Sequence, residues 1–315
     1  MCDYSLYTAS WPFYVDKSDI KGKRAMAQHA LKPGAAILEN EFPLACWPLS
    51  VSSAGSGPLM NGDAAHFCEE CLKLAPISDP LSPFCSDACL NSATDGGSGW
   101  FPLLGGSAGL TRLRKADCAH QILTLEALGR VTARILAMAI ALSKEGKEDW
   151  KTVRAAAGSP VARLCFRLDL DLGDVAAMRT ALQDVMEPQM SELLPERQLD
   201  EWLPSVAELR TFLSKLALNG QTLHIWGTDA NGSLALMKAA GVYTLQSTFN
   251  HDCRPNVRVE VSTDCMITLI TERPVEADEE LTITYISDGD LIARREALSL
   301  YAFQCTCSRC REEAS

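Results

Sequence analysis

The sequence predicts an α+β protein in which strand patterns near both ends of the chain enclose a long helical region. Three observations support this: a strand pattern at 35–38, a helical pattern from His120 onward, and a return to strand patterns after Asn219-Gly220. With 315 residues, 47% of them hydrophobic and 22% charged, the chain can form one large domain or two small ones.

The N-terminal strand pattern is bounded by turn residues. Pro33-Gly34 precedes the apolar residues 35–38 and Asn40 follows them, which favours a turn and then a strand. Residues 48–65 and 93–109 are rich in Ser, Gly and Pro. We therefore predict loops on both sides of the first group of cysteines.

The middle of the chain has apolar residues at helical spacing. One predicted helix face consists of Leu128, Val131, Ile135, Met138 and Leu142. Further helices are predicted over residues 175–186, 190–202 and 206–218.

The C-terminal part returns to strand patterns. Residues 257–261 and 266–271 flank a Ser-Thr-Asp turn and predict a hairpin, and residues 281–285 predict another strand. Residues 288–300 predict a helix with Asp288 near its N-terminus.

Charge and segment lengths narrow the function classes. The net charge of −11 argues against duplex nucleic acid as the main ligand, because phosphate binding needs clustered Lys and Arg. A basic peptide suits this surface, although acidity also keeps an intracellular protein soluble. The first residues lack the basic flank and apolar core of a secretory signal, and the longest apolar run, 135–142, is far below the roughly 20 residues that cross a bilayer. We expect an intracellular protein, in the nucleus or cytoplasm, without a membrane span.

The C-terminal cysteines indicate a metal site rather than disulfides, because reducing compartments disfavour disulfides. Cys305, Cys307 and Cys310 supply three thiols, whereas a closed structural zinc site needs four ligands. The best fourth donor is Cys253 in NHDCRPN (250–256), because Pro255 restricts the backbone and the motif precedes the predicted hairpin. The alternative is three reduced cysteines in a frayed tail.

A second zinc site is predicted from the earlier cysteines. Cys68, Cys71, Cys85 and Cys89 form a C-x2-C and a C-x3-C pair that can supply four thiolates. The alternative is a loop with incidental cysteines, and His66 is predicted to be a loop residue rather than a ligand. The scattered cysteines are predicted to be small buried hydrophobes: Cys2, Cys46, Cys118, Cys165 and Cys265.

Three motifs, in order, resemble those of SET-domain lysine methyltransferases. NHDCRPN resembles the family's NHSCxPN, EELTITY (279–285) resembles its GEELxxxY, and YAFQCTC from Tyr301 resembles the post-SET entry. FCSDAC (84–89) resembles the YCSxxC of the MYND finger, but the ligands of the second MYND zinc site are absent and Cys118 and His120 have the wrong spacing. The chain therefore resembles the SET-and-MYND (SMYD-like) family with a reduced, single-zinc finger. Because the sequence stops after the post-SET cysteines, it resembles the shorter branch without a C-terminal helical repeat domain.

The resemblance implies a mainly β SET core with small sheets, a helical insert, and a zinc-binding finger and tail. The implied segments are the N-terminal part of a split SET domain at 1–47, the reduced finger at 66–92, the helical insert at 110–218, the C-terminal part of the SET domain at 219–300, and the post-SET zinc segment at 301–315.

The resemblance also implies an S-adenosylmethionine-dependent protein-lysine N-methyltransferase. Tyr285 matches the tyrosine whose phenol orients the amine, although a strand tyrosine can also simply pack its ring. The implied cofactor-binding residues are Lys21, Gly22, Lys23, Asn219, Asn250, His251, Tyr301 and Phe303. Tyr301 and Phe303 could instead be core residues, and 21–24 a solvated charge run.

Two positions depart from the family pattern. Arg24 replaces the second glycine of the N-terminal turn, where it could tighten carboxylate binding or obstruct the site. Asp252 replaces the usual serine and adds a negative charge beside Cys253.

Two other functions compete with methyl transfer. The first is a SET-like scaffold with weak or no catalysis that binds proline-rich peptides through its finger. The second is a zinc hydrolase, which is disfavoured because the sequence has no HExxH or His-rich open site. For the enzyme, we expect a monomer that acts on a lysine-bearing protein, either a histone tail or a non-histone protein.

Overall fold

The computed structural model describes residues 4–18, 22–53, 67–73, 83–94, 99–115, 124–144, 149–195, 197–228 and 234–314. The chain forms two units. The first comprises residues 1–42, 243–262 and 266–315, and the second comprises residues 43–242 and 263–265. Helices and small sheets occur in both, so the predicted α+β class is confirmed. The five segments predicted from the resemblance remain a prediction.

The first unit contains a four-stranded sheet with the order β1-β2-β10-β7. Its strands are β1 (Phe13–Ser18), β2 (Gly22–Ala27), β7 (Asn250–His251) and β10 (Glu280–Ile283). β2 pairs antiparallel with β1 and β10, and β10 pairs in parallel with β7. This sheet therefore brings the N-terminal turn region beside the NHDCRPN and EELTITY segments.

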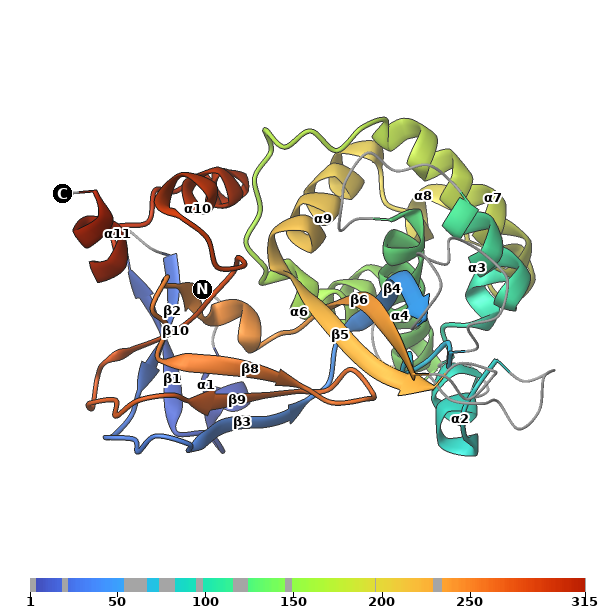
Figure 1. Ribbon diagram of the computed structural model, residues 1–315. Coiled ribbons are helices and arrows are strands. Elements are labelled where there is room, and N and C mark those ends of the chain that lie inside the picture. Colours follow the sequence, from blue (N-terminus) through green and yellow to red (C-terminus); the bar gives the residue numbers. More distant parts are fainter. Residues whose placement is uncertain are drawn as a thin grey trace. The chain divides into compact units, whose positions relative to one another are not determined.

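A second sheet of the first unit has the order β3-β9-β8 (Figure 1). Its strands are β3 (Ala36–Glu41), β8 (Val257–Val261) and β9 (Ile267–Thr271). The predicted hairpin is confirmed, since β8 pairs antiparallel with β9. Alternate residues of β9 are buried, as expected for a strand with one face on the core. That core also holds Phe13 and Phe249, whose rings meet edge to face at 5.2 Å.

Short helices complete the first unit. They are α1 (Ser5–Thr8), η2 (Gln246–Thr248), α10 (Leu291–Leu298), η3 (Ser299–Tyr301) and α11 (Ser308–Glu313). The helix predicted over 288–300 begins later than expected. Asp290 is its N-cap, because the Asp290 side chain accepts a hydrogen bond from the N–H of Ala293 at 2.8 Å.

The second unit contains a sheet with the order β4-β6-β5. Its strands are β4 (Ala45–Ser53), β5 (Gly220–Thr228) and β6 (Leu234–Val242). Residues 48–53 were predicted to be a loop but belong to β4, so that part of the prediction is wrong. The rest of the predicted loop, 54–65, lies outside the described residues. Pro48 makes this segment resemble a loop, because proline is rare inside strands. In the structure the register of the β4–β6 pair shifts between Pro48 and Ser50. Such an irregular position tolerates the N–H that proline lacks.

Helices form the rest of the second unit (Figure 1). They are α2 (Asp87–Thr94), η1 (Pro102–Leu104), α3 (Gly106–Lys115), α4 (Leu125–Lys144), α5 (Trp150–Ala157), α6 (Ser159–Ala162), α7 (Val175–Leu193), α8 (Leu199–Trp202) and α9 (Val206–Asn219). No helix among the described residues is both long and apolar enough to span a membrane.

Several helix predictions need correction. The loop predicted over 93–109 is helical in its last part, where η1 and α3 begin. α7 continues to Leu193, so the helix predicted over 190–202 is divided between the end of α7 and the short α8. The α4 face is partly wrong, because Met138 is 50% exposed whereas the neighbouring Leu136 and Ile140 are buried. α4 contacts several elements, so its buried face is broader than one stripe.

Candidate active site and cysteine clusters

Four cysteines of the first unit meet although one is distant in sequence. The sulfur atoms of Cys253, Cys305, Cys307 and Cys310 all lie within 4.8 Å of one another. Cys253 Sγ is 3.9 Å from Cys305 Sγ and 3.6 Å from Cys310 Sγ. The cluster contains the Cys253 that the sequence predicted as the fourth donor, and it can hold a metal ion.

Arginines support the tail cluster. Arg294 is buried, and its guanidinium donates to Cys310 Sγ at 3.8 Å and pairs with Glu313 at 2.8 Å. Arg254 pairs with Glu312 on α11 at 2.6 Å. These contacts bring positive charge to a group of sulfurs that is anionic when deprotonated, and they attach α11 to the loop of Cys253.

The second cluster lies in the second unit. The sulfur atoms of Cys68, Cys71, Cys85 and Cys89 also lie within 4.8 Å of one another. Cys85 Sγ is 3.7 Å from both Cys71 Sγ and Cys89 Sγ. The structure therefore brings together the four cysteines that the sequence predicted. His66 lies outside the described residues.

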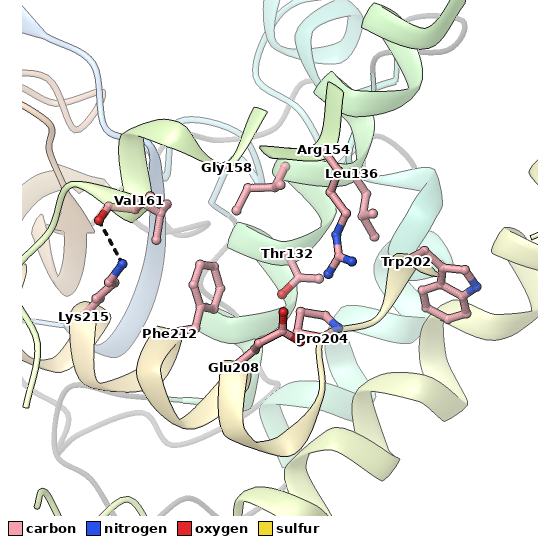
Figure 2. A pocket seen from close by; sticks show the side chains of 12 residues that line it. Thr132, Leu136, Arg154, Gly158, Val161, Trp202, Pro204, Glu208, Phe212 and Lys215 are labelled. Atoms are coloured by element: carbon pink, nitrogen blue, oxygen red, sulfur yellow. Dashed lines mark hydrogen bonds between the residues drawn. The ribbon is translucent and has the colours of Figure 1, made fainter. Parts of the chain in front are cut away.

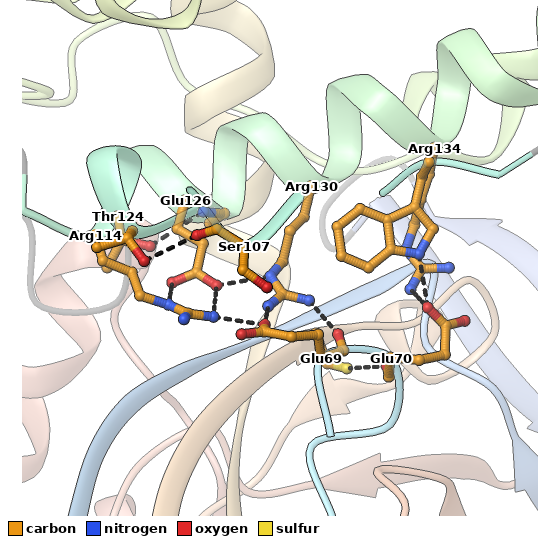
Figure 3. Close-up of polar contacts among 12 residues, drawn as sticks. Glu69, Glu70, Ser107, Arg114, Thr124, Glu126, Arg130 and Arg134 are labelled. Carbon is orange, nitrogen blue, oxygen red and sulfur yellow. Dashed lines mark hydrogen bonds and ion pairs between the residues drawn. The ribbon is translucent and has the colours of Figure 1, made fainter. Parts of the chain in front are cut away.

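A buried ion-pair network holds the Cys68–Cys71 loop on the helices (Figure 3). Arg130 of α4 is fully buried, donates to the Glu69 carbonyl and carboxylate, and pairs with Glu126 at 2.8 Å. Arg114 of α3 contacts both carboxylates, at 2.6 Å for Glu69 and 2.8 Å for Glu126.

A second pair lies next to this network. Arg134 pairs with Glu70 at 2.8 Å, and Glu70 also accepts from the indole of Trp100 at 2.6 Å. The Arg130 and Arg134 guanidiniums each lie 4.9 Å from the Trp100 ring. Sequence reasoning missed these residues. The available signal was the i,i+4 spacing of Glu126, Arg130 and Arg134 on a helix, with two acids between the first cysteines.

Asn250 and His251 occupy the short strand β7. The Asn250 amide donates to the Lys23 carbonyl at 2.9 Å and to the Glu280 carboxylate at 2.8 Å. His251 Nδ1 accepts the N–H of Tyr285 at 3.1 Å, and His251 Nε2 lies 3.2 Å from Cys253 Sγ. Burial lowers the pKa of His251 to about 4, so the ring is neutral at neutral pH, as its acceptor role requires. These contacts join three sequence-predicted segments.

Tyr285 follows β10 and is partly buried. Its phenol donates to the Phe249 carbonyl at 2.7 Å. Its ring centroid is 5.5 Å from that of His251 and 4.9 Å from that of Tyr301. Phe303 lies 6.4 Å from Tyr301 and 6.2 Å from His251, and is 40% exposed. We call His251, Tyr285, Tyr301 and Phe303 the aromatic cluster. All four were predicted as site residues.

The N-terminal turn region enters this site through β2. Gly22 has φ +72°, which other residues rarely adopt. The Lys23 ammonium donates to the Tyr4 hydroxyl at 3.1 Å. Arg24 pairs with Asp16, its cross-strand partner on β1, at 2.6 Å. Lys21 lies outside the described residues.

The remaining predicted residues have local roles in the structure. Asn219 lies in the second unit, at the end of α9, and its amide donates to the Cys165 and Lys215 carbonyls at 2.9 Å and 2.7 Å. Asp252 accepts the N–H of Arg254 at 2.7 Å and so stabilises the turn around Cys253.

A partly buried carboxylate holds the segment that leads into β7. Glu41, at the end of β3, accepts the N–H groups of Leu245 and Gln246 at 2.6 Å and 3.0 Å. Burial raises the pKa of Glu41 from 4.5 to about 7, although these hydrogen bonds oppose the rise.

Glu41 should make stability depend on pH. A carboxyl whose pKa is raised by folding contributes stability that is complete below its unfolded pKa and is lost as the pH rises through the folded pKa. We expect the free energy of unfolding to fall between pH 4.5 and about 7, by roughly 2 kcal/mol after allowance for partial exposure. Denaturant titrations at several pH values check this. Glu41→Gln should flatten that dependence, whereas Glu39→Gln, at an exposed position of β3, should leave it intact. An unchanged profile for Glu41→Gln would contradict the assignment.

Comparison with known proteins agrees with the geometry. Residues 138–286 match the SET domain family model. A histone-lysine N-methyltransferase of Arabidopsis thaliana, ASHR2, is 24% identical over 94% of this chain and 71% of its own length. A histone-lysine N-methyltransferase of Candida glabrata, SET5, is 35% identical over 23% of this chain, and a SET and MYND domain-containing protein of Dictyostelium discoideum is 36% identical over 29% of it.

The extent of these matches differs. The chain spans only 14% of the Candida glabrata relative and 18% of the Dictyostelium relative. A crystal structure of the SET domain of LSMT bound to lysine and AdoHcy covers 93% of this chain and 52% of its own, with 14% identity and a TM-score of 0.31. Over residues 138–286 the chain is therefore similar to the SET domain, and several of its sequence relatives are named as histone-lysine N-methyltransferases.

Proposed function

We propose that this chain is an S-adenosylmethionine-dependent protein-lysine N-methyltransferase. The proposal rests on one observation. Asn250, the aromatic cluster and the tail cysteines lie together in one unit of the structure. These residues come from segments that are far apart in the sequence, and each segment resembles a SET motif. The match of residues 138–286 to the SET domain supports the same conclusion.

The residues fit such a cofactor. Phe303 presents a partly exposed ring on which an adenine can stack. The Asn250 amide nitrogen is used within the protein, and its oxygen is an acceptor for a ligand amine. Gly22 has no atoms within 4 Å of the position of a Cβ, so a ligand can approach the backbone there. When bound, the cofactor supplies an electrophilic methyl group on a sulfonium.

Tyr285 would position the substrate amine. The phenol is fixed by its bond to the Phe249 carbonyl, and its ring is held by His251 and Tyr301. A fixed phenol oxygen and a neighbouring carbonyl can align a lysine amine through hydrogen bonds. The surrounding rings exclude water, which favours the neutral, nucleophilic form of the amine.

We further propose that both cysteine clusters bind zinc. Tetrahedral coordination at about 2.3 Å places ligand sulfurs about 3.8 Å apart. Two sulfur pairs of each cluster are separated by 3.6 to 3.9 Å, and all sulfurs of a cluster lie within 4.8 Å of one another. The Cys68–Cys89 cluster would be the single-zinc site of a reduced MYND-like finger. The Cys253 cluster would attach the post-SET tail to the NHDCRPN loop.

Metal analysis of the purified protein tests the zinc sites. We expect two zinc equivalents per chain, and one in Cys253→Ser, because three thiolates no longer close the tail site. Cys165 lies outside both clusters and is exposed, so its predicted burial is wrong, and Cys165→Ser should keep both zinc ions. Full metal content in Cys253→Ser would exclude Cys253 as a ligand.

The substrate is proposed to be a lysine-bearing protein, with histone tails as the first candidates because several relatives are named as histone-lysine methyltransferases. A net charge of −11 suits a basic peptide. A proline-rich peptide at the finger is a proposed additional partner. We place the enzyme, acting as a monomer, in the nucleus or cytoplasm.

Labelled methyl transfer into a protein extract tests the function. We expect label from S-adenosylmethionine to appear on lysine of at least one protein, identified by mass spectrometry. Calorimetry with S-adenosylmethionine separates the enzyme from a scaffold, because a scaffold should bind it weakly or not at all. Absence of both transfer and binding would overturn the proposed function.

A further inference from the structure

The second unit contains a cavity of about 210 Å³ between helices α4, α5, α6, α8 and α9 (Figure 2). Most of its lining is apolar and includes Ile135, Leu136, Val161, Trp202, Pro204 and Phe212. An apolar cavity of about 150 Å³ holds a benzene ring. This cavity therefore has room for an aromatic or branched aliphatic group.

Thr132 brings a buried hydroxyl to the cavity. It is 4% exposed, and its Oγ1 has no hydrogen-bond partner among the described residues. A buried hydroxyl that stays unsatisfied destabilises the fold, so a ligand that accepts its hydrogen bond gains affinity. Figure 2 shows its oxygen directed toward Glu208, another residue of the lining.

Arg154 and Glu208 place opposite charges at this side of the cavity. Arg154 donates to the Glu201 carbonyl at 2.9 Å, and no carboxylate of the described part of the chain forms an ion pair with it. The Glu208 carboxylate accepts the N–H and the hydroxyl of Ser205, both at 2.8 Å. Burial lowers the pKa of Arg154, and the attraction of Glu208 only partly offsets this. The guanidinium therefore faces the cavity with donors that the protein does not use.

We propose that this cavity binds a free zwitterionic α-amino acid with an apolar side chain. The ligand carboxylate meets Arg154 and the Thr132 hydroxyl, the ligand ammonium meets Glu208, and the side chain fills the apolar part beside Phe212. Both ligand charges are needed. A simple carboxylate would be repelled by Glu208, and a simple amine would be repelled by Arg154.

The surroundings suit this orientation. A second, polar hollow of about 690 Å³ also has Arg154 and Glu208 in its lining. The charged end of the ligand can therefore stay partly hydrated, which lowers its desolvation cost. Lys215, by contrast, donates to the Ala162 carbonyl at 3.0 Å near the apolar end.

Calorimetry on the full chain tests the site with four probes. We expect saturable binding of L-phenylalanine and L-leucine, and at least tenfold weaker binding of 3-phenylpropionate and of phenethylamine. Equal or tighter binding of 3-phenylpropionate would overturn the proposal in favour of a simple anion site. No saturable binding of either amino acid would also overturn it.

Variants locate the site. Glu208→Gln keeps the capping box, since Gln also serves at that position, and should weaken amino-acid binding at least tenfold by removing the charge. Arg154→Met should do the same. Thr132→Val should weaken binding several-fold without lowering the melting temperature, because the hydroxyl that it removes has no partner among the described residues. Arg210→Met, on α9 but outside the lining, is the control and should bind normally. Undiminished binding by Glu208→Gln and Arg154→Met would overturn the proposal.

Discussion

Tyr285→Phe should lower methyl transfer by about 100-fold, the size of loss expected when a group that aligns the reacting amine is removed. The substitution deletes the hydroxyl but keeps the ring, which contacts His251 and Tyr301. Loss of the bond to the Phe249 carbonyl should cost about 1 kcal/mol of stability, too little to unfold the chain. Steady-state transfer of labelled methyl groups, with calorimetric binding of S-adenosylmethionine, measures the two effects separately.

The matched control is Tyr14→Phe in the same unit. Tyr14 donates from its hydroxyl to Asp278 at 2.9 Å, at the surface and away from the aromatic cluster. This variant should transfer methyl groups at the normal rate. Normal turnover in Tyr285→Phe as well would remove the phenol from the mechanism, whereas lost cofactor binding would indicate a structural role.

Arg130→Met should destabilise the second unit by about 3–5 kcal/mol, the range found when one partner of a buried ion pair is removed. Arg130 is fully buried and contacts Glu69 and Glu126. Its loss leaves two buried carboxylates with Arg114 as their remaining cationic partner in the network. Denaturant unfolding measures the change. Adding Glu126→Gln to this variant should recover part of the loss, because it removes one of the uncompensated charges.

Arg258→Met provides the comparison for a surface pair. Arg258 contacts Glu260 at 2.8 Å, and both side chains are well exposed, so we expect no measurable change in stability. A loss in Arg130→Met no larger than that in Arg258→Met would show that the network contributes little to stability.

The network also explains why a small cysteine finger can hold its shape. Glu69 and Glu70 lie between Cys68 and Cys71, and both bind arginines of α4. The finger is thereby anchored to the longest helix of the second unit through charge as well as through its own sulfurs. This anchor would serve a scaffold and an enzyme equally, so calorimetry with S-adenosylmethionine remains the experiment that distinguishes them.

The sequence by itself determined the α+β class, the hairpin at 257–271 and the two groups of cysteines. It could do so because these features depend on local periodicity, turn residues and ligand spacing. Pro255 and the hairpin that follows it pointed to Cys253, and the resemblance to SET motifs pointed to Tyr285, Tyr301 and Phe303. The sequence placed loops where β4 and α3 begin or continue, because these segments contain Pro, Gly and Ser, which are typical of loops. Contacts with other parts of the fold stabilise the strand and the helix there.

Only the tertiary structure decided which partners these residues have. The pairing of Arg24 with Asp16, the raised pKa of Glu41 and the buried Arg130 network depend on long-range packing, because desolvation and charge proximity are set by neighbours distant in sequence. The same holds for the cavity around Thr132. Its polar groups come from different helices, and no local pattern specifies that they face one another.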